Sequence, residues 1–286
     1  MQRLLSDLVD LLALERLDRD LFRGNSQDLG WGAIFGGQVL GQALSAAAQT
    51  VSADRAVHSL HGYFIRAGDL RRPIVYSVDR LRDGKSFSTR RVDAVQEGEA
   101  IFSLEASFQV EEEGLEHQDP MPDVPPPEAL RSERELALTF ADRLPAAFRA
   151  IATAERPIEI RPVEPRNPLK PTAVEPRRQL WVRAIDALPD DAALHRYMLA
   201  YASDFSFLGT ALDPHGVSWL TPGMQVASLD HAMWFHRPFR FDDWLLYSVD
   251  SPSASGSRGL VRGRFFDRAG RLVASCAQEG LIRRRR

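Results

Sequence analysis

The tetrapeptide Tyr76-Ser-Val-Asp79 occurs a second time as Tyr247-Ser-Val-Asp250, at an offset of 171 residues (247 − 76 = 171). Nearly the same offset aligns further identical residues, namely Phe64 with Phe235, Arg66 with Arg237, Ser103 with Ser275, and Leu40-Gly41 with Leu208-Gly209. Small insertions explain why the offset varies by a few residues. Because the order of these matches is kept over most of each half, the sequence predicts a duplicated domain.

Each predicted copy consists of one helix followed by an antiparallel meander. In the first copy, residues 35–51 are rich in small side chains and lack proline, which favours a helix that can lie close to other backbone. Alternating hydrophobicity predicts the strands of this copy at Val57–Arg66, Pro73–Leu81, Phe87–Val95 and Ala100–Val110. The opening segment, residues 1–22, has the apolar spacing of an amphipathic helix.

A proline-rich stretch separates the two copies. Residues 111–132 include Pro125-Pro-Pro127 and are unsuited to regular hydrogen bonding. A helix is predicted at residues 133–151, and a second central helix at residues 190–212 with Asp190 as its N-cap. The remaining strands are expected at 158–163, 179–185, 225–237, 244–250, 259–266 and 271–282. We therefore expect an N-terminal domain at 1–115, a linker and helix at 116–150, and a C-terminal domain at 151–286.

The composition is that of an ordinary globular protein. Of the 286 residues, 44% are hydrophobic and 26% are charged, and the net charge of −3 disfavours nucleic acid as a partner. The single cysteine, Cys276, excludes an internal disulfide and points to the cytoplasm. We expect no membrane insertion, because no apolar run approaches about 18 residues.

The two copies differ in three polar residues, all in the second copy. By the offsets of the helix and the strands, the sequence aligns Asp204 with Gly36, Ser228 with Val57, and Gln278 with Ala106. Each residue alone would most often be structural. Together they supply a general base, a hydroxyl and an amide, which could hold a water and direct it at a carbonyl without a metal or cofactor. A thioester suits such a site, because a thiolate leaves readily.

Other catalytic arrangements are less consistent with the sequence. Ser228, Asp230 and His231 could form a serine-hydrolase triad, but neighbours in a strand point to opposite faces and the chain has no Gly-x-Ser-x-Gly motif. The histidines lack the spacing of metal ligands, so we expect no metal site. Cys276 has small neighbours and is expected to be a core residue.

Several stretches closely resemble the acyl-CoA thioesterase II family, whose members are double hotdog proteins. The resemblance covers nearly the whole chain, and its most specific stretches are Leu21-Phe-Arg-Gly24, Ile34-Phe-Gly-Gly-Gln38, Leu81-Arg-Asp-Gly84, Tyr201-Ala-Ser-Asp204, Leu229-Asp-His-Ala-Met-Trp-Phe-His-Arg-Pro238 and Gln278-Glu-Gly280. It implies an α+β tandem hotdog fold, in which each antiparallel sheet wraps a long central helix. It also implies association of chains, as a dimer or tetramer.

The resemblance further implies hydrolysis of medium- and long-chain fatty acyl-CoA to fatty acid and CoA. The family's Asp, Thr or Ser, and Gln, which jointly activate water, correspond to Asp204, Ser228 and Gln278. Ser228 stands where threonine is common, so the hydroxyl is kept and the methyl group is lost. A chain that binds acyl-CoA without hydrolysing it is the alternative. Hotdog dehydratases are similar but use a histidine near the central helix, and neither predicted helix has one at a matching place.

Overall fold

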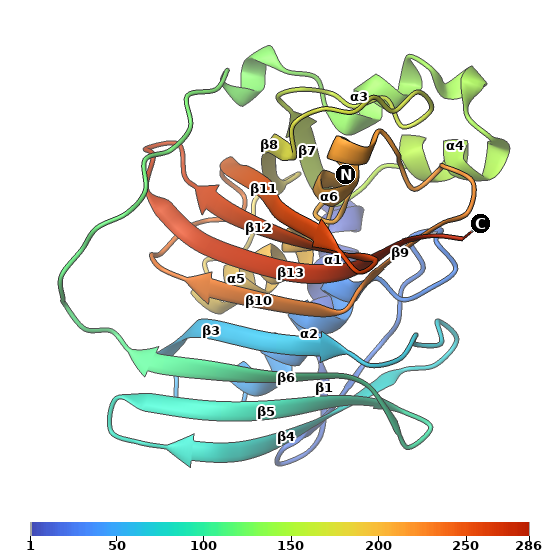
Figure 1. The fold of residues 1–286 in the computed structure, drawn as a ribbon. Helices are drawn as coiled ribbons and strands as arrows, with labels where there is room; N and C mark the ends of the chain where they lie inside the picture. Colours follow the sequence, from blue (N-terminus) through green and yellow to red (C-terminus); the bar gives the residue numbers. More distant parts are fainter. Residues whose placement is uncertain (1, 286) are drawn as a thin grey trace.

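The computed structural model describes residues 2–285 and has an α+β architecture (Figure 1). The first half contains helices α1 (Gln2–Leu12) and α2 (Gly36–Ala48) and strands β1 (Glu15–Asp18), β2 (Leu21–Gly24), β3 (Arg55–Phe64), β4 (Ile74–Asp83), β5 (Phe87–Gln96) and β6 (Glu99–Val110). The second half contains α3 (Glu133–Leu138), α4 (Ala146–Thr153), α5 (Ala192–Ser203) and α6 (Gly209–Leu212) with strands β7 (Ile158–Pro162), β8 (Arg177–Ala184), β9 (Met224–Ser228), β10 (Asp230–Phe235), β11 (Leu245–Ser255), β12 (Arg258–Phe266) and β13 (Leu272–Arg284). The described residues also contain three short 3-10 helices, at Pro127–Ala129, Ala141–Arg143 and Asp213–His215.

All strands belong to one antiparallel sheet that runs through both halves. Its order is β1-β2-β4-β5-β6-β3-β10-β13-β12-β11-β8-β7, and β9 pairs with β13 beside this path. The halves meet where β3 pairs with β10, for example Leu60 opposite Met233. Figure 1 shows this junction in the middle of the sheet, with α2 and α5 on one side of it.

The strand pairing follows the same shift as the sequence repeat. Tyr76 lies opposite Ala94 between β4 and β5, and Tyr247 lies opposite Phe265 between β11 and β12, so both partners are shifted by 171 residues. The sequence offsets for the strands therefore describe equivalent positions in the two halves.

Helices α2 and α5 pack against each other in opposite directions, and glycine makes this packing possible. A Cβ atom on Gly37 would lie 2.2 Å from the carbonyl oxygen of Tyr201, and one on Gly41 would lie 3.1 Å from that of Tyr197. The expectation of a helix that approaches other backbone closely is confirmed. This packing brings the start of α2 to the end of α5.

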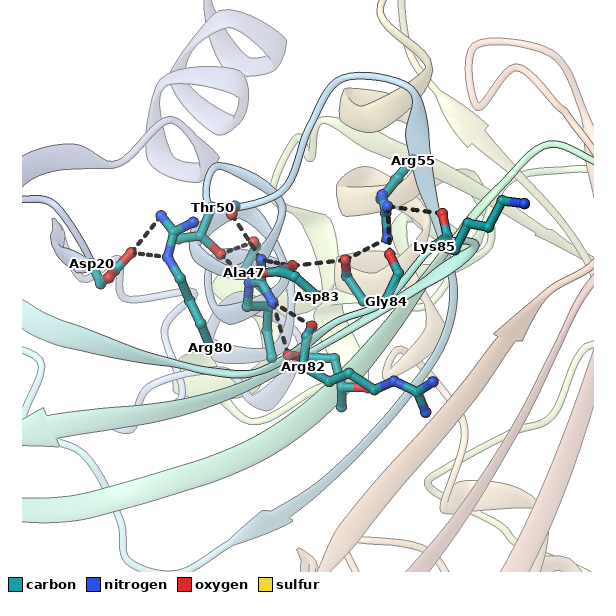
Figure 2. A network of polar contacts seen from close by, with 12 residues as sticks. Asp20, Ala47, Thr50, Arg55, Arg80, Arg82, Asp83, Gly84 and Lys85 are labelled. Carbon is teal, nitrogen blue, oxygen red and sulfur yellow. Dashed lines mark hydrogen bonds and ion pairs between the residues drawn. The ribbon is translucent and has the colours of Figure 1, made fainter.

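A buried arginine holds the far end of α2 to the sheet. Arg90 on β5 is 1% exposed. Its guanidinium donates to the hydroxyl and carbonyl of Thr50, just beyond α2, and to Asp83 at the end of β4. Figure 2 shows Thr50 and Asp83 in this network, and beside them Arg55 donating to the carbonyls of Gly84 and Lys85. Charge-assisted bonds of this kind fix the helix relative to the strands.

Three expectations about secondary structure are wrong in part. The opening helix stops at Leu12, and residues 15–24 form β1 and β2, because pairing with β4 outweighs the local helical pattern. The helix expected at 133–151 is divided into α3, a 3-10 turn and α4, and Pro145 precedes α4. The strand expected at 225–237 is interrupted at Leu229, which separates β9 from β10.

The second central helix also differs from its prediction. It begins after Asp191, whose side chain accepts the Ala193 N–H, while Asp190 pairs with Arg240 instead. It ends at Ser203 rather than at residue 212, because Ser206 has a left-handed backbone (φ 58°) that no helix can continue. The chain resumes a helix only at α6.

The proline-rich stretch packs on the second half of the sheet. The indole N–H of Trp181 donates to the carbonyl of Pro125, and Met121 and Val124 contact a second small core that includes Trp181 and Trp244. Within residues 2–285, no helix is long and apolar enough to cross a membrane.

Candidate active site

Asp204 lies directly after α5, where the helix breaks. It is the C-cap residue, with φ −85° and ψ −10°. Beyond the break, α6 is held to β8 by Arg178, which donates to both carboxylate oxygens of Asp213 at 2.6 and 2.8 Å and to the carbonyl of Gly209. Asp204 itself keeps a helical backbone, and its carboxylate reaches the start of α2, where it accepts the Gly37 N–H.

Three hydrogen bonds converge on the half-buried carboxylate of Asp204. The Gln278 side-chain amide donates to Oδ1 at 3.2 Å, and the Ser228 hydroxyl donates to the same oxygen at 3.4 Å. The backbone N–H of Gly37 donates to Oδ2 at 3.0 Å. The structure thus brings all three residues singled out in the sequence together.

The irregular pairing of β9 and β10 with β13 places Ser228 beside Gln278. Ser228 lies opposite Gly280, while Ala232 lies opposite Ala277, and the Leu229 N–H between them donates to the Glu279 carbonyl. Gln278 lies on the buried face of β13, together with Ala274 and Cys276, and is 1% exposed. The three residues share this face because side chains alternate along a strand.

The environment of Asp204 makes its carboxylate more basic than an exposed one. Burial raises the pKa of Asp204, while the hydrogen bonds from Gln278, Gly37 and Ser228 oppose that rise by stabilising the ionised form. A carboxylate offers about four acceptor positions, of which three are used, so Oδ2 can still accept a proton from water. The Gln278 amide nitrogen uses one of its two hydrogens in the bond to Asp204.

Sequence reasoning missed the part played by the first half of the chain. Gly36 was aligned with Asp204 as its counterpart in the other copy, but it starts α2, whereas Asp204 follows the end of α5. A Cβ on Gly36 would lie 2.7 Å from Asp204 Oδ2, so the two residues are neighbours at one site. The offset that aligned Leu40-Gly41 with Leu208-Gly209 (208 − 40 = 168) is therefore wrong for the central helices. Val57 and Ala106, aligned with the other two residues, are buried apolar positions of β3 and β6.

A second residue that was missed is His231, which is completely buried behind Gln278. Its Nδ1 lies 3.3 Å from the Gln278 side-chain oxygen, and its Nε2 lies 3.0 Å from the Ser203 hydroxyl. Burial lowers the pKa of His231 to about 4. A sequence signal existed, since alternation places His231 on the same face of β10 as Met233 and Phe235.

Aromatic side chains adjoin the polar group. Phe35, just before α2, and Phe205, just after Asp204, have ring centroids 4.4 Å apart, and Trp31 packs on both. The guanidinium of Arg156 lies over the rings of Trp31 and Phe205. Two surface hollows, of about 370 and 330 Å³, lie elsewhere and are not lined by Asp204, Ser228 or Gln278.

The residues of the alternative catalytic arrangements bond to other partners. A triad requires the histidine to bridge the serine and the aspartate, but the two ring nitrogens of His231 bond to Ser203 and Gln278, and Asp230 accepts the backbone N–H of Glu279. Cys276 is buried against the Tyr247 hydroxyl, and burial raises the pKa of its thiol to about 12. The expectation that Cys276 is a core residue is confirmed. Residues 2–285 contain no cluster of three or more His, Cys, Asp or Glu suited to a metal ion.

This chain is similar to known proteins in both sequence and fold. Residues 148–281 match the family model for acyl-CoA thioesterase, and residues 26–109 match the model for the acyl-CoA thioesterase N-terminal domain. The chain is 44% identical to acyl-CoA thioesterase 2 of Haemophilus influenzae, over 99% of both chains. It is also similar to the crystal structure of acyl-CoA thioesterase II TesB2 from Mycobacterium marinum, with a TM-score of 0.78 and 44% identity over 97% of this chain and 98% of that one.

A more distant structure identifies the class of fold. A protein of unknown function with a hot dog fold from Alicyclobacillus acidocaldarius matches with a TM-score of 0.77 at 19% identity, over 98% of this chain and 99% of that one. The chain thus has the hotdog fold. It belongs to the acyl-CoA thioesterase family, and its enzyme class is thioester hydrolase.

Proposed function

We propose that this protein hydrolyses medium- and long-chain fatty acyl-CoA to free fatty acid and CoA, using a water activated by Asp204, Ser228 and Gln278. The names of the relatives support acyl-CoA as the substrate. The aromatic group of Trp31, Phe35 and Phe205 beside the carboxylate supports an apolar acyl chain. The observation that carries the proposal is the convergence of three donors on one half-buried carboxylate.

In the proposed reaction, Asp204 takes a proton from water while the water oxygen attacks the thioester carbonyl carbon. The C–S bond of the tetrahedral intermediate then breaks, and the CoA thiolate leaves and recovers the proton from Asp204. The Ser228 hydroxyl and the free hydrogen of the Gln278 amide orient the water. Positioning and general-base catalysis are enough for this reaction, because the leaving thiolate is stable.

The same proposal includes a tandem arrangement of two hotdog domains, at residues 1–115 and 151–286, with residues 116–150 between them. The shift of 171 residues in both the strand pairing and the sequence supports it. Association of chains as dimers or tetramers is part of the proposal, supported by the exposed Tyr63 and Ile65 at the end of β3. Sedimentation velocity measures the association directly.

We also propose a cytoplasmic location, which the single cysteine supports.

Substitution of Asp204 by Asn tests the base. Asn is nearly isosteric but cannot take the proton, so kcat should fall about 10²–10⁴-fold with little change in affinity for a non-hydrolysable S-alkyl-CoA. CoA release is followed with a thiol-reactive dye, and the exposed Asp243→Asn is the matched control. Wild-type turnover by Asp204→Asn would refute the assignment. Binding of acyl-CoA without turnover by the unaltered protein would instead favour a non-hydrolytic role.

The role of Ser228 is tested separately. Its 3.4 Å bond to Asp204 fits a hydroxyl that orients water, so Ser228→Ala should lower kcat less than Asp204→Asn. A serine nucleophile would instead form an acyl-enzyme. Rapid acid quench followed by mass spectrometry detects such an adduct on Ser228, and finding it would overturn the water mechanism.

A further inference from the structure

A buried chain of side chains lies behind the proposed site, on the side away from solvent. It runs from Asp204 through the amide of Gln278 and the imidazole of His231 to the hydroxyl of Ser203. Gln278, His231 and Ser203 are 1%, 0% and 0% exposed, so bulk water does not compete for the bonds that join these three side chains.

The two ends of the Gln278 amide have opposite hydrogen-bonding character. Its NH₂ group can only donate, and its carbonyl can only accept. An ionised Asp204 only accepts, so the NH₂ group must face it and the carbonyl must face His231. A reversed amide would place its carbonyl against the carboxylate and remove the donor.

We infer that His231 is a positioning residue, which donates from Nδ1 to the Gln278 carbonyl and so holds the amide with its NH₂ group toward Asp204. The inference rests on the proposed function. In this tautomer Nε2 carries no proton and can accept a hydrogen bond from the Ser203 hydroxyl. The same hydroxyl lies 2.8 Å from the Ala200 carbonyl oxygen, so its single proton is shared between these two acceptors. His231 itself exchanges no proton with the substrate.

The groups that could disturb this arrangement remain uncharged around neutral pH. Burial lowers the pKa of His231 to about 4, so the imidazole is neutral. The Tyr247 hydroxyl and the Cys276 thiol, which face the same region from β11 and β13, have pKa values raised by burial and stay protonated. Asp230 precedes His231 on β10, so its side chain points to the opposite face of the strand, where its carboxylate accepts the Glu279 backbone N–H. Asp204 is thus the charge that the amide must satisfy.

A matched pair of substitutions separates the two imidazole nitrogens. In His231→Asn the amide nitrogen is as many bonds from the backbone as Nδ1, so the donor to Gln278 is retained. In His231→Gln the polar group reaches the position of Nε2, and the donor to Gln278 is lost. We expect His231→Asn to keep kcat near wild type and His231→Gln to lower it roughly 10- to 100-fold, the value of a bond to a charged group.

The fall of kcat/KM at low pH, here called the acid limb, reports the protonation of Asp204. A purely structural role of His231 would leave the pH of this limb unchanged, whereas a positioning role would shift it. A misplaced amide no longer stabilises ionised Asp204, so the limb should move to higher pH in His231→Gln, as in Gln278→Leu. It should stay in place in His231→Asn, which also shows that the limb is not the titration of His231. The double variant His231→Gln/Gln278→Leu should show the limb of Gln278→Leu alone, because no amide remains to be oriented. Thermal unfolding confirms that each variant is folded.

The outcomes distinguish this inference from the proposed function. If Asp204→Asn keeps its turnover, the base assignment fails whatever the His231 variants do. If Asp204→Asn is inactive but His231→Gln leaves the acid limb unmoved, or His231→Asn is impaired as much as His231→Gln, the positioning role is refuted. Should His231→Gln fail to fold, a wild-type limb and kcat in His231→Asn support the inference, and a displaced limb in that variant overturns it.

Discussion

Replacing Gly37 by Ala should damage both the packing of the two halves and the proposed base. The new Cβ would lie 2.2 Å from the Tyr201 carbonyl oxygen, roughly 1 Å short of ordinary contact. A backbone oxygen cannot rotate away as a side chain can, so α2 and α5 must separate. Overpacking of this kind costs about 1–3 kcal/mol, and for a chain of this size the melting temperature falls by about 2–4 °C per kcal/mol.

The same displacement moves the Gly37 N–H away from Asp204, where it now donates at 3.0 Å. A hydrogen bond to a charged group is worth about 1.5–3 kcal/mol, so kcat should fall roughly 10- to 100-fold. CoA release and thermal unfolding measure the two effects.

Gly41→Ala is the control for Gly37→Ala. Its Cβ would lie 2.9 Å from the end of the Leu12 side chain, which can rotate, and 3.1 Å from the Tyr197 carbonyl oxygen, which a shift of a few tenths of an ångström relieves. Gly41 also lies one turn further from Asp204 than Gly37 does. The better helix propensity of alanine, up to about 1 kcal/mol, partly offsets the strain. If Gly37→Ala keeps wild-type kcat and melting temperature, or if both variants behave alike, the reasoning about this helix contact is wrong.

Three further predictions concern the site and its support. Turnover should fall as the pH falls through the pKa of Asp204, because the protonated carboxyl cannot act as a base. Since burial raises this pKa, the midpoint of the fall in kcat/KM should lie above 3.8, the ordinary pKa of an aspartate, and a midpoint below 3.8 would contradict the burial argument. Ser228→Thr should keep at least wild-type kcat, since the hydroxyl remains and the β-branched side chain has fewer rotamers; a tenfold loss in steady-state assays would contradict the orienting role. Arg178→Met removes the closer of two arginine partners of the buried Asp213, the other being Arg166 at 3.9 Å, and should lower the free energy of unfolding by up to about 3–5 kcal/mol, measured with urea. Arg262→Met breaks an exposed pair with Asp250 and should change it by less than about 1 kcal/mol.

The strands could be predicted from the sequence more closely than the helix ends. Alternation and turn residues placed β3, β4, β5 and β6 within two residues of their observed ends, because one face of each strand is buried. The break after Asp204 could not be read in the same way. Residues 204–208 contain neither glycine nor proline, and the break depends on distant contacts such as Arg178 with Asp213.

The candidate site was predictable only where side chains differ between the two copies. Ser228 and Gln278 stood out because the first copy is apolar at the aligned positions, Val57 and Ala106. Asp204 stood out against Gly36, although the structure shows that Gly36 is not its equivalent. Gly37 contributes a backbone N–H, which every residue except proline has, so no comparison of side chains could reveal it. His231 was visible as a buried histidine, but its partner Gln278 lies 47 residues away, and only the pairing of β10 with β13 brings them together.

The position of the carboxylate at the α2–α5 contact ties activity to the integrity of the whole chain. Asp204, Ser228 and Gln278 come from one half and the Gly37 N–H from the other, so a fragment of residues 151–286 alone would hold the proposed base without that donor. The same fragment would expose the edge of β10 that β3 now covers, and an open strand edge tends to pair with another chain. Mutations that loosen the β3–β10 junction should therefore reduce turnover before the sheet itself unfolds, and a survey of such variants would find catalytic defects far from any residue that touches the substrate.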